Sequence, residues 1–294
     1  MSKHTEPPAA TRRDFRFLER MRVRWAEVDM QKVVFNGHYL MYFDTAVAGY
    51  WRAMALPYEA TLADLDGDLF VRKASLEYEA PARYDEILDV GLRCQRLGTS
   101  SFVLQGTVFR GEQRLVSCEL VYVFADPHAQ GSRPLPRPLR EVIEAYEGGH
   151  TMVDVRTGGW DALGKDARAI RTAVFVEEQG IPAKLEHDDA DADCVHALAV
   201  NRLGRPVGTG RLLPAVNGVA KLGRMAALPT VRGAGIGAAM LRALADASRA
   251  RGDTTLLLHA QSSAIGFYAA QGFAKQGEPF LEAGIVHQAM TRAP

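Results

Sequence analysis

The hydrophobic pattern in the first half of the chain predicts one long helix and a series of strands. Residues 35–54 carry apolar side chains at helical spacing. A strand is expected before this helix, at residues 20–25. After it, residues 71–79, 87–97, 101–110 and 114–124 alternate between apolar and polar side chains and are separated by turn sequences. A single helix with several antiparallel strands indicates a sheet wrapped around that helix.

The second half alternates between strands and helices. Helices are expected over residues 161–176, 235–251 and 264–271, and strands over residues 151–156, 196–202, 206–213, 220–228, 254–259 and 285–290. This order predicts an α/β core with a parallel element. The fold class expected for the whole chain is therefore α+β, with an antiparallel sheet around a long helix followed by an α/β domain.

A composition change near the middle of the chain marks the boundary between these halves. Residues 126–138 hold four prolines and a glycine, a short helix is expected at residues 139–146, and Glu147-Gly148-Gly149 ends it. We expect the junction at about residues 147–151, with one domain over residues 15–147 and a second over residues 151–294.

Composition and charge narrow the possible functions. The 294 residues suit about two domains, and 35 basic against 35 acidic residues give a net charge of +0. Such a balance gives no general attraction to nucleic acid, and the longest apolar runs are too short for a membrane helix. Residues 1–13 lack the apolar core of a secretory signal. Cys94, Cys118 and Cys194 form neither a disulfide framework nor a zinc motif. We expect a cytoplasmic protein without a metal.

A glycine-rich turn joins a predicted strand to a predicted helix in the second half. The strand ends near Leu228, and Arg232-Gly233-Ala234-Gly235-Ile236-Gly237 leads into the helix. Glycines let backbone N–H groups approach an anion, and the helix N-terminus adds partial positive charge. The turn lacks the Gly-Lys-Ser/Thr of a Walker loop and the length of a dinucleotide fingerprint. Taken alone, it is either a pyrophosphate cradle or an ordinary turn.

This turn and a second motif resemble those of GNAT-type N-acetyltransferases over about residues 151–293. The second motif, Phe267-Tyr268-x-x-x-Gly272-Phe273, follows about 30 residues later, and residues 174–182 with the acidic residues 186–193 resemble the ElaA-like branch. The resemblance implies acetyl-CoA as co-substrate and an amine as acceptor. It also implies that coenzyme A pyrophosphate binds the amides of Val231, Arg232, Gly233, Ala234, Gly235, Ile236 and Gly237, and that pantetheine pairs with Met225, Ala226 and Ala227.

In that resemblance, Tyr268 is the general acid that protonates the leaving thiolate. The alternative is a core tyrosine on an apolar helix face. The base stays open: Glu177, Glu178 and Glu186 are candidates, although each is more typical of a solvated charge. His259 and His287 are interpreted as strand histidines whose hydrogen bonds are satisfied within the fold.

The first half has its own candidate site, around residues 24–39. Asp29 follows the expected strand, and the long helix begins about seven residues later. A carboxylate beside a helix N-terminus can attack an acyl carbon or activate water against it, while free backbone N–H groups stabilise the oxyanion. This chemistry needs no metal and no serine or cysteine nucleophile. A helix cap or loop carboxylate is the alternative role for Asp29.

This segment resembles hotdog-fold acyl-CoA thioesterases of the 4-hydroxybenzoyl-CoA thioesterase type, over about residues 17–146. Residues 78–86 and 97–102 support the match. The resemblance implies that Asp29 is catalytic, that the backbone N–H of Asn36 polarises the thioester carbonyl, and that the domain forms a homodimer or homotetramer. Two departures stand out: Lys32 replaces a usual glycine, and Asn36 stands where many relatives carry histidine or tyrosine.

Two hypotheses follow from the two resemblances. In the first, the chain is a bifunctional enzyme that hydrolyses acyl-CoA with its first half and transfers acetyl to an amine with its second. In the second, the first half is a non-catalytic dimerisation or acyl-CoA-sensing module attached to an active acetyltransferase. Lys32 and Asn36 favour the second hypothesis.

Overall fold

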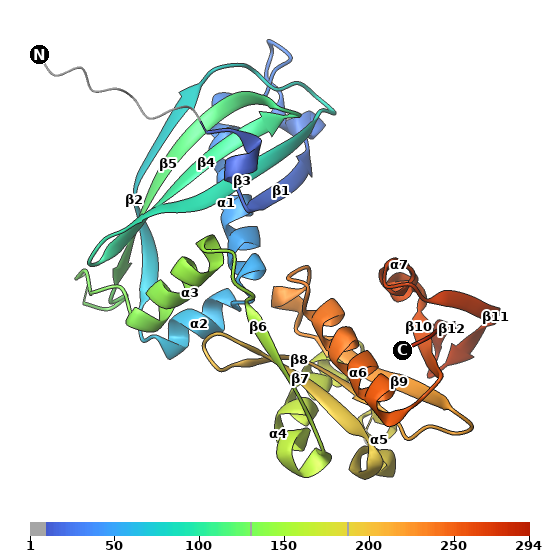
Figure 1. Cartoon of the computed structure of the whole chain (residues 1–294). Coiled ribbons are helices and arrows are strands. Elements are labelled where there is room, and N and C mark those ends of the chain that lie inside the picture. Colours follow the sequence, from blue (N-terminus) through green and yellow to red (C-terminus); the bar gives the residue numbers. More distant parts are fainter. Residues whose placement is uncertain (1–9, 130, 187) are drawn as a thin grey trace, which may run out of the picture. The chain divides into compact units, whose positions relative to one another are not determined.

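The computed structural model describes residues 10–129, 131–186 and 188–294 and divides the chain into two compact units, one ending at Thr151 and the other beginning at Met152 (Figure 1). Residues 1–9, which hold most of the segment expected to lack a secretory signal, lie outside the described residues. Within the described ranges, no helix is both long and apolar enough to cross a lipid bilayer.

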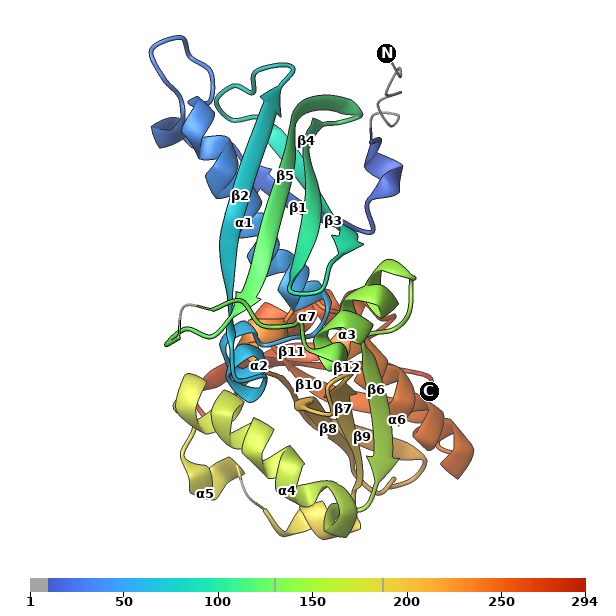
Figure 2. The ribbon, with the colours of Figure 1, turned by 90° about the vertical axis from the view of Figure 1, so that its left-hand side faces the viewer.

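The N-terminal unit is a five-stranded sheet that curves around one long helix, as predicted. The helix α1 spans Asn36–Ala53. The sheet order is β1-β3-β4-β5-β2 and every pair is antiparallel (Figure 2). The strands are β1 (Phe17–Arg22), β2 (Asp68–Tyr78), β3 (Ile87–Leu97), β4 (Ser101–Arg110) and β5 (Gln113–Ala125), and the other α-helices are α2 (Tyr58–Asp64) and α3 (Arg137–Glu147).

The apolar face of α1 is buried against this sheet. Phe43 and Ala46 have 0% exposure and Tyr50 has 1%. The sheet makes room for the helix at Gly106 on β4, where a Cβ atom would lie 2.5 Å from the ring of Phe43. The close approach of helix and sheet therefore depends on a residue without a side chain at this position.

Two predictions for this unit were wrong in detail. The strand expected at residues 20–25 ends at Arg22, because the chain turns at Trp25–Glu27 and the carboxylate of Glu27 closes that turn by accepting hydrogen bonds from Arg24 N (2.7 Å) and Nε (2.6 Å). Trp25 lies in this turn and is 74% exposed. The short helix α2 was not predicted, because its seven residues give too little periodicity.

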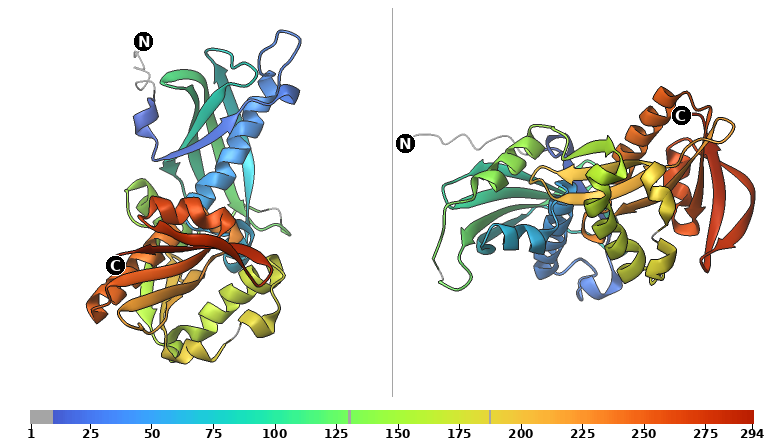
Figure 3. Two further views of the ribbon diagram at one scale, coloured as in Figure 1. Left: turned by 90° about the vertical axis from the view of Figure 1, so that its right-hand side faces the viewer. Right: turned by 90° about the horizontal axis from the view of Figure 1, so that it is seen from below.

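The C-terminal unit is a seven-stranded sheet in the order β11-β12-β10-β9-β8-β7-β6 (Figure 3). Its strands are β6 (Val153–Gly158), β7 (Val195–Asn201), β8 (Pro206–Leu212), β9 (Val219–Ala227), β10 (Thr255–Gln261), β11 (Ala274–Glu282) and β12 (Ile285–Arg292), and its α-helices are α4 (Trp160–Arg171), α5 (Ala183–Glu186), α6 (Ile236–Arg251) and α7 (Ile265–Ala270). β9 and β10 pair in parallel, as the predicted α/β order requires.

Helices α4 and α6 cover opposite faces of this sheet. Leu198 and Val200 on β7 belong to the core cluster that also contains residues of α4. The glycines of β8 face α6 instead: a Cβ at Gly208 would lie 2.7 Å from Ile236, and one at Gly210 would lie 3.2 Å from Leu244. Small residues thus let α6 lie close to the middle of the sheet.

The two parallel strands separate partway along their length. β9 and β10 pair only from Val219 with Thr255 to Leu222 with Leu258, although both strands continue further. β9 also contains an extra residue relative to β8, and Arg224 in this bulge has a φ of 52°. A bulge bends the strand that contains it, and beyond Leu222 β9 and β10 no longer pair but line a common cavity.

Two further features of this unit differ from the sequence expectation. The helix expected at residues 161–176 changes at Thr172 into a π-helix that extends to Glu178. The strand β11 was not predicted, because Gly277 and Pro279 interrupt it and its register with β12 shifts between Gln276 and Phe280. Proline and glycine are tolerated there since β11 is an edge strand.

Candidate functional sites

The glycine-rich turn forms the N-terminus of α6. Gly233 and Gly235 have φ values of 92° and 78°, and Gly235 is the N-cap of the helix in a left-handed conformation. A Cβ at Gly235 would meet nothing within 4 Å, so glycine is required there by backbone conformation and not by lack of space. The turn therefore presents open backbone toward the outside of the helix end.

Several backbone N–H groups of this turn donate to no acceptor in the described part of the chain. Those of Val231, Arg232 and Ala234 donate to carbonyls within the turn. Among the residues that the structure describes, none accepts a hydrogen bond from the N–H groups of Gly233, Gly235, Ile236, Gly237 and Ala238. Converging free amides at a helix N-terminus suit an anion such as a pyrophosphate. Of the seven amides predicted to bind pyrophosphate, those of Gly233, Gly235, Ile236 and Gly237 are therefore free to do so, and the binding itself stays a prediction.

Arg232 links this turn to the π-helix. Its guanidinium donates to both carboxylate oxygens of Glu178, at 2.6 and 2.5 Å, and its Nε donates to the carbonyl of Ala227 at 3.2 Å. The hydrogen bonds and charge of Arg232 hold the pKa of Glu178 below its usual value. Glu178 is therefore committed to this ion pair and is a poor candidate for the base.

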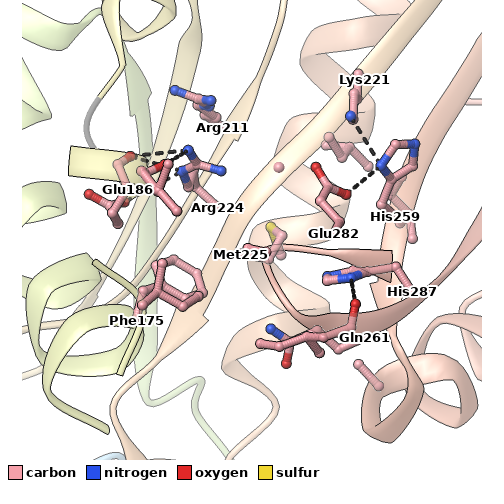
Figure 4. A pocket seen from close by; sticks show the side chains of 18 of the residues that line it. Phe175, Glu186, Arg211, Lys221, Arg224, Met225, His259, Gln261, Glu282 and His287 are labelled. Atoms are coloured by element: carbon pink, nitrogen blue, oxygen red, sulfur yellow. Dashed lines mark hydrogen bonds and ion pairs between the residues drawn. The ribbon is translucent and has the colours of Figure 1, made fainter. Parts of the chain in front are cut away.

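The gap between β9 and β10 opens into a cavity of about 580 Å³. Figure 4 shows two polar walls, one with Arg211, Arg224 and Glu186 and the other with Lys221, His259 and Glu282. Apolar side chains complete the lining, among them Phe175, Met225, Leu258 and Tyr268. The cavity is of the size usual for small-ligand sites and has polar groups at defined places.

The arginine wall belongs to a buried ion network. Arg171, which is 1% exposed, is paired with Glu186 and donates to Asp191 at 2.8 Å, and Arg211 donates to Asp188 and Asp191 at 2.6 Å each. Burial alone would raise the pKa of Asp191, but hydrogen bonds and charge from the two arginines outweigh it and lower that pKa. The expectation that Glu186 is a solvated charge was wrong, because its backbone segment folds over Arg171 and leaves it 2% exposed.

Tyr268 lies on α7 and lines the same cavity. It is 8% exposed, and its ring packs against those of Phe267 and Phe273 with centroids 4.9 and 5.8 Å away. Burial raises the pKa of Tyr268 to about 12, so its hydroxyl keeps its proton at neutral pH. Tyr268 is thus a core tyrosine that also lines the cavity, and its role as general acid stays a prediction.

The opposite wall contains a cluster that the sequence did not indicate. His259 Nδ1 lies 2.8 Å from Glu282 Oε2 and 3.2 Å from Lys221 Nζ. Glu282 ends the unpredicted strand β11, so sequence reasoning had no means to place it beside β10. His287, in contrast, bonds through Nδ1 to the carbonyl of Ile285 at 2.9 Å, as expected for a satisfied strand histidine.

In the N-terminal unit, Asp29 lies in a tight hairpin just before α1. Asp29 N donates to Val33 O and Lys32 N donates to Asp29 O, both at 2.9 Å, and Val28 pairs with Val34. Lys32 adopts a φ of 62°, the left-handed conformation for which glycine is favoured. Lysine therefore keeps the path of the turn at a cost in backbone strain. The Asp29 carboxylate accepts a hydrogen bond from Gln31 N at 2.8 Å and is half-buried.

The hairpin returns directly into α1 at Asn36. The amide of Phe35 donates to Glu27 O at 2.9 Å, and the buried carboxylate of Glu27 accepts from the hydroxyl of Tyr42 at 2.7 Å. These contacts fix the hairpin to the helix. Asn36 folds its side-chain oxygen back onto Gly37 N at 2.9 Å, while its own backbone N–H meets no acceptor in the described part of the chain. An amide at the helix start is thus free for an oxyanion.

Comparison with known proteins assigns a family to each unit. Residues 31–117 match the thioesterase superfamily and residues 165–293 match the acetyltransferase (GNAT) domain. The chain therefore belongs to both families: it joins an N-terminal thioesterase-superfamily domain to a C-terminal GNAT acetyltransferase domain. Domains of both kinds typically act on substrates linked to coenzyme A, and the recognised motifs agree with this assignment.

Individual relatives correspond to one unit each. A putative acetyltransferase of Bacillus subtilis is 40% identical over 126 residues, which cover 42% of this chain and 84% of the relative. A putative esterase of Aquifex aeolicus is 30% identical over 94 residues, 32% of this chain and 73% of the relative. The acyl-CoA thioester hydrolase YbgC of Escherichia coli is 27% identical over 120 residues, 40% of this chain and 89% of the relative.

Proposed function

We propose that the chain is a bifunctional coenzyme A-dependent enzyme. Its N-terminal domain hydrolyses acyl-CoA thioesters, and its C-terminal domain transfers acetyl from acetyl-CoA to an amine. The observation that carries the proposal is that each unit has the parts its reaction needs. The C-terminal unit has free amides at a helix start, two parallel strands that separate and a cavity between them. The N-terminal unit has a hairpin that carries Asp29 directly before the N-terminus of α1.

In the C-terminal domain, the pyrophosphate of coenzyme A binds the free amides between Gly233 and Ala238. The pantetheine arm then extends along β9 at Met225, Ala226 and Ala227, where β10 no longer occupies the edge of the strand. The acetyl group enters the cavity. Attack by the amine expels the thiolate, and Tyr268, which lines the cavity and retains its proton, protonates that thiolate.

In the N-terminal domain, Asp29 attacks the thioester carbonyl or activates water against it. The free backbone N–H of Asn36 and the partial positive charge of the α1 terminus stabilise the developing oxyanion. The left-handed Lys32 supports this role, since the loop keeps its turn without the usual glycine. The name of the Escherichia coli relative, an acyl-CoA thioester hydrolase, points to the same substrate class.

The N-terminal domain assembles as a homodimer or homotetramer. β2 is an edge strand of the sheet, and Phe70, Val71 and Tyr78 on it are 48%, 53% and 53% exposed. Exposed apolar side chains on an unpaired strand edge are typical of a surface that another chain covers. Light scattering coupled to size-exclusion chromatography measures the assembly directly, and a monomer would contradict this part of the proposal.

The proposal is tested by assaying the full chain for both reactions. Hydrolysis is followed as thiol release from short-chain, medium-chain and aromatic acyl-CoAs, and transfer as thiol release from acetyl-CoA that depends on an added amine. We expect both activities. Hydrolysis no faster than in buffer would contradict the thioesterase role, and the absence of amine-dependent release would contradict the transferase role.

One observation favours the alternative that the N-terminal domain only senses acyl-CoA. The side chain of Asn36 is folded onto Gly37 N, so it does not replace the histidine or tyrosine of many relatives. In that case acyl-CoA binds without turnover. Binding measured by calorimetry together with no hydrolysis would establish this second function.

A further inference from the structure

The acetyl-transfer cavity contains a histidine whose surroundings are those of a proton acceptor. His259 on β10 is hydrogen-bonded through Nδ1 to Glu282 on β11, and its side chain is 25% exposed toward the cavity that Tyr268 also lines (Figure 4). Within the described ranges no residue hydrogen-bonds to His259 Nε2. One nitrogen of the ring is therefore held, and the other is available.

The protonation state of this pair follows from its partners. Nδ1 cannot donate a hydrogen bond to Glu282 and also accept one from Lys221. Burial would raise the pKa of Glu282, but the hydrogen bond from His259 and the charges of Lys221, His259 and His287 lower it, so the carboxylate is ionised. Nδ1 must then carry the hydrogen and donate it to Glu282. In the neutral ring this leaves the lone pair on Nε2.

Titratable groups surround the His259–Glu282 pair. Lys221 on β9 and Glu282 on β11 contact His259, His287 on β12 acts electrostatically on Glu282, and the ring of Phe280 packs edge-on against His259 with its centroid 4.7 Å away. The other acidic groups near the cavity are committed elsewhere: Glu178 to Arg232, and Glu186 and Asp188 to the arginine wall. Glu282 is the carboxylate that faces a titratable acceptor.

We propose that His259 is the catalytic base of the acetyl transfer and that Glu282 is its positioning residue. This inference rests on the proposed acetyltransferase function. The amine nitrogen forms a C–N bond with the acetyl carbon, and its proton passes to His259 Nε2 directly or through one water. The C–S bond breaks, and the thiolate takes the proton of the Tyr268 hydroxyl. Glu282 stabilises the imidazolium, which then returns its proton to solvent as Tyr268 is reprotonated.

The test compares histidine variants of the full chain with acetyl-CoA and a panel of tyramine, putrescine, Nα-acetyl-lysine and glucosamine. His259→Asn should lower kcat by roughly 10²–10⁴-fold, the range for loss of a general base, and should remove the acidic limb of the pH–rate profile. The Kd for coenzyme A should stay unchanged. His287→Asn is the matched control, because it removes a cavity histidine whose Nδ1 bonds to the carbonyl of Ile285 and not to a carboxylate. It should retain the maximal rate and an acidic limb, with the limb displaced only by the loss of a charge near Glu282.

Glu282→Gln tests whether Glu282 positions and stabilises the His259 imidazolium or only stabilises the fold. Glutamine still accepts the hydrogen bond from Nδ1 but carries no charge, so the imidazolium is less stabilised and the acidic limb should move to lower pH. Glu278→Gln, on the same strand but outside the cavity lining, should leave the limb in place. A merely structural Glu282 would change the thermal midpoint without moving the limb.

Each outcome decides between the proposals. A His259→Asn enzyme that keeps its rate and its acidic limb overturns the role of His259 while leaving acetyl transfer intact. A wild-type chain that binds coenzyme A but acetylates none of the amines overturns both the proposed function and this inference. If His259→Asn loses coenzyme A affinity, His259→Gln, which is equally unable to accept the proton, gives the deciding measurement.

Discussion

Gly235→Glu is the substitution that most directly probes the anion cradle at α6. Gly235 is the N-cap with a φ of 78°, its own N–H and that of Ile236 meet no acceptor in the described part of the chain, and the space beside it is open. Any side chain there costs roughly 1–2 kcal/mol in left-handed backbone strain. Gly235→Gln has nearly the same strain and bulk, so the difference between Glu and Gln isolates the charge.

The charge contribution can be bounded from simple electrostatics. Two unit charges 4 Å apart interact by about 1 kcal/mol in water and about 4 kcal/mol near a protein surface. Because Gly235 is exposed, we take about 2 kcal/mol of repulsion between the glutamate and a bound pyrophosphate, which corresponds to roughly a 30-fold weaker Kd. At high salt this difference should shrink, since the Debye length falls to about 3 Å at 1 M.

The assay is calorimetric titration of the full chain with coenzyme A. The Glu and Gln variants differ only at the C-terminal turn, so a binding event whose Kd differs between them belongs to that turn and not to the N-terminal domain. Equal Kd values for the Glu and Gln variants, or wild-type affinity in Gly235→Glu, would refute the assignment of the turn as the pyrophosphate site.

Three further predictions follow from the sites. Asp29→Asn should lower acyl-CoA hydrolysis by at least about 10²-fold with little change in acyl-CoA affinity and none in acetyl transfer; hydrolysis that survives the change would place the catalytic group elsewhere. Tyr268→Phe should lower acetyl-transfer kcat by roughly 10²–10⁴-fold while coenzyme A binding persists, and an unaltered kcat would leave Tyr268 a core residue only. The pKa of Asp191 is lower in the folded protein than in the unfolded chain, where it is about 3.9. The ionised carboxylate therefore stabilises the fold fully above the unfolded pKa, and this stabilisation is lost as the pH falls through the folded pKa. The thermal midpoint should therefore decrease when the pH is lowered below about 4. Asp191→Asn should be less stable than the wild type at neutral pH by about 3 kcal/mol, because it leaves buried Arg171 and Arg211 short of a partner. A thermal midpoint that does not depend on pH would contradict the role of this network.

The parts of the fold that the sequence predicted are those with strong periodicity. The long helix was expected at residues 35–54 and found at Asn36–Ala53, and two strands, Ile87–Leu97 and Ser101–Arg110, match their predicted ranges. Burial on one face produces these patterns, so they can be read from one sequence. An edge strand such as β11, with every residue but Phe280 exposed, leaves no such pattern.

The residues of the candidate sites also fall into those that the sequence could locate and those that it could not. Motifs local in sequence, the Arg232–Gly237 turn and the Asp29 hairpin, could be located because their chemistry lies within a few consecutive residues. The pairing of His259 with Glu282 depends on a β11–β12 hairpin that brings residue 282 back across β10, and the burial of Glu186 depends on Arg171 from a different helix. No residue spacing in a single sequence indicates long-range contacts of this kind.

The proposed activities constrain why the two domains share a chain. Hydrolysis of an acyl-CoA and acetyl transfer from acetyl-CoA both consume a thioester and both release coenzyme A, so neither reaction supplies the substrate of the other. Each proposed site instead releases the same free coenzyme A as product, and in the C-terminal domain the row of helix-terminal amides would bind it again. What the two proposed activities have in common is therefore that both use coenzyme A thioesters and both release coenzyme A. An excess of coenzyme A would slow both reactions together, and this links their rates through concentration without requiring any transfer of an intermediate between sites.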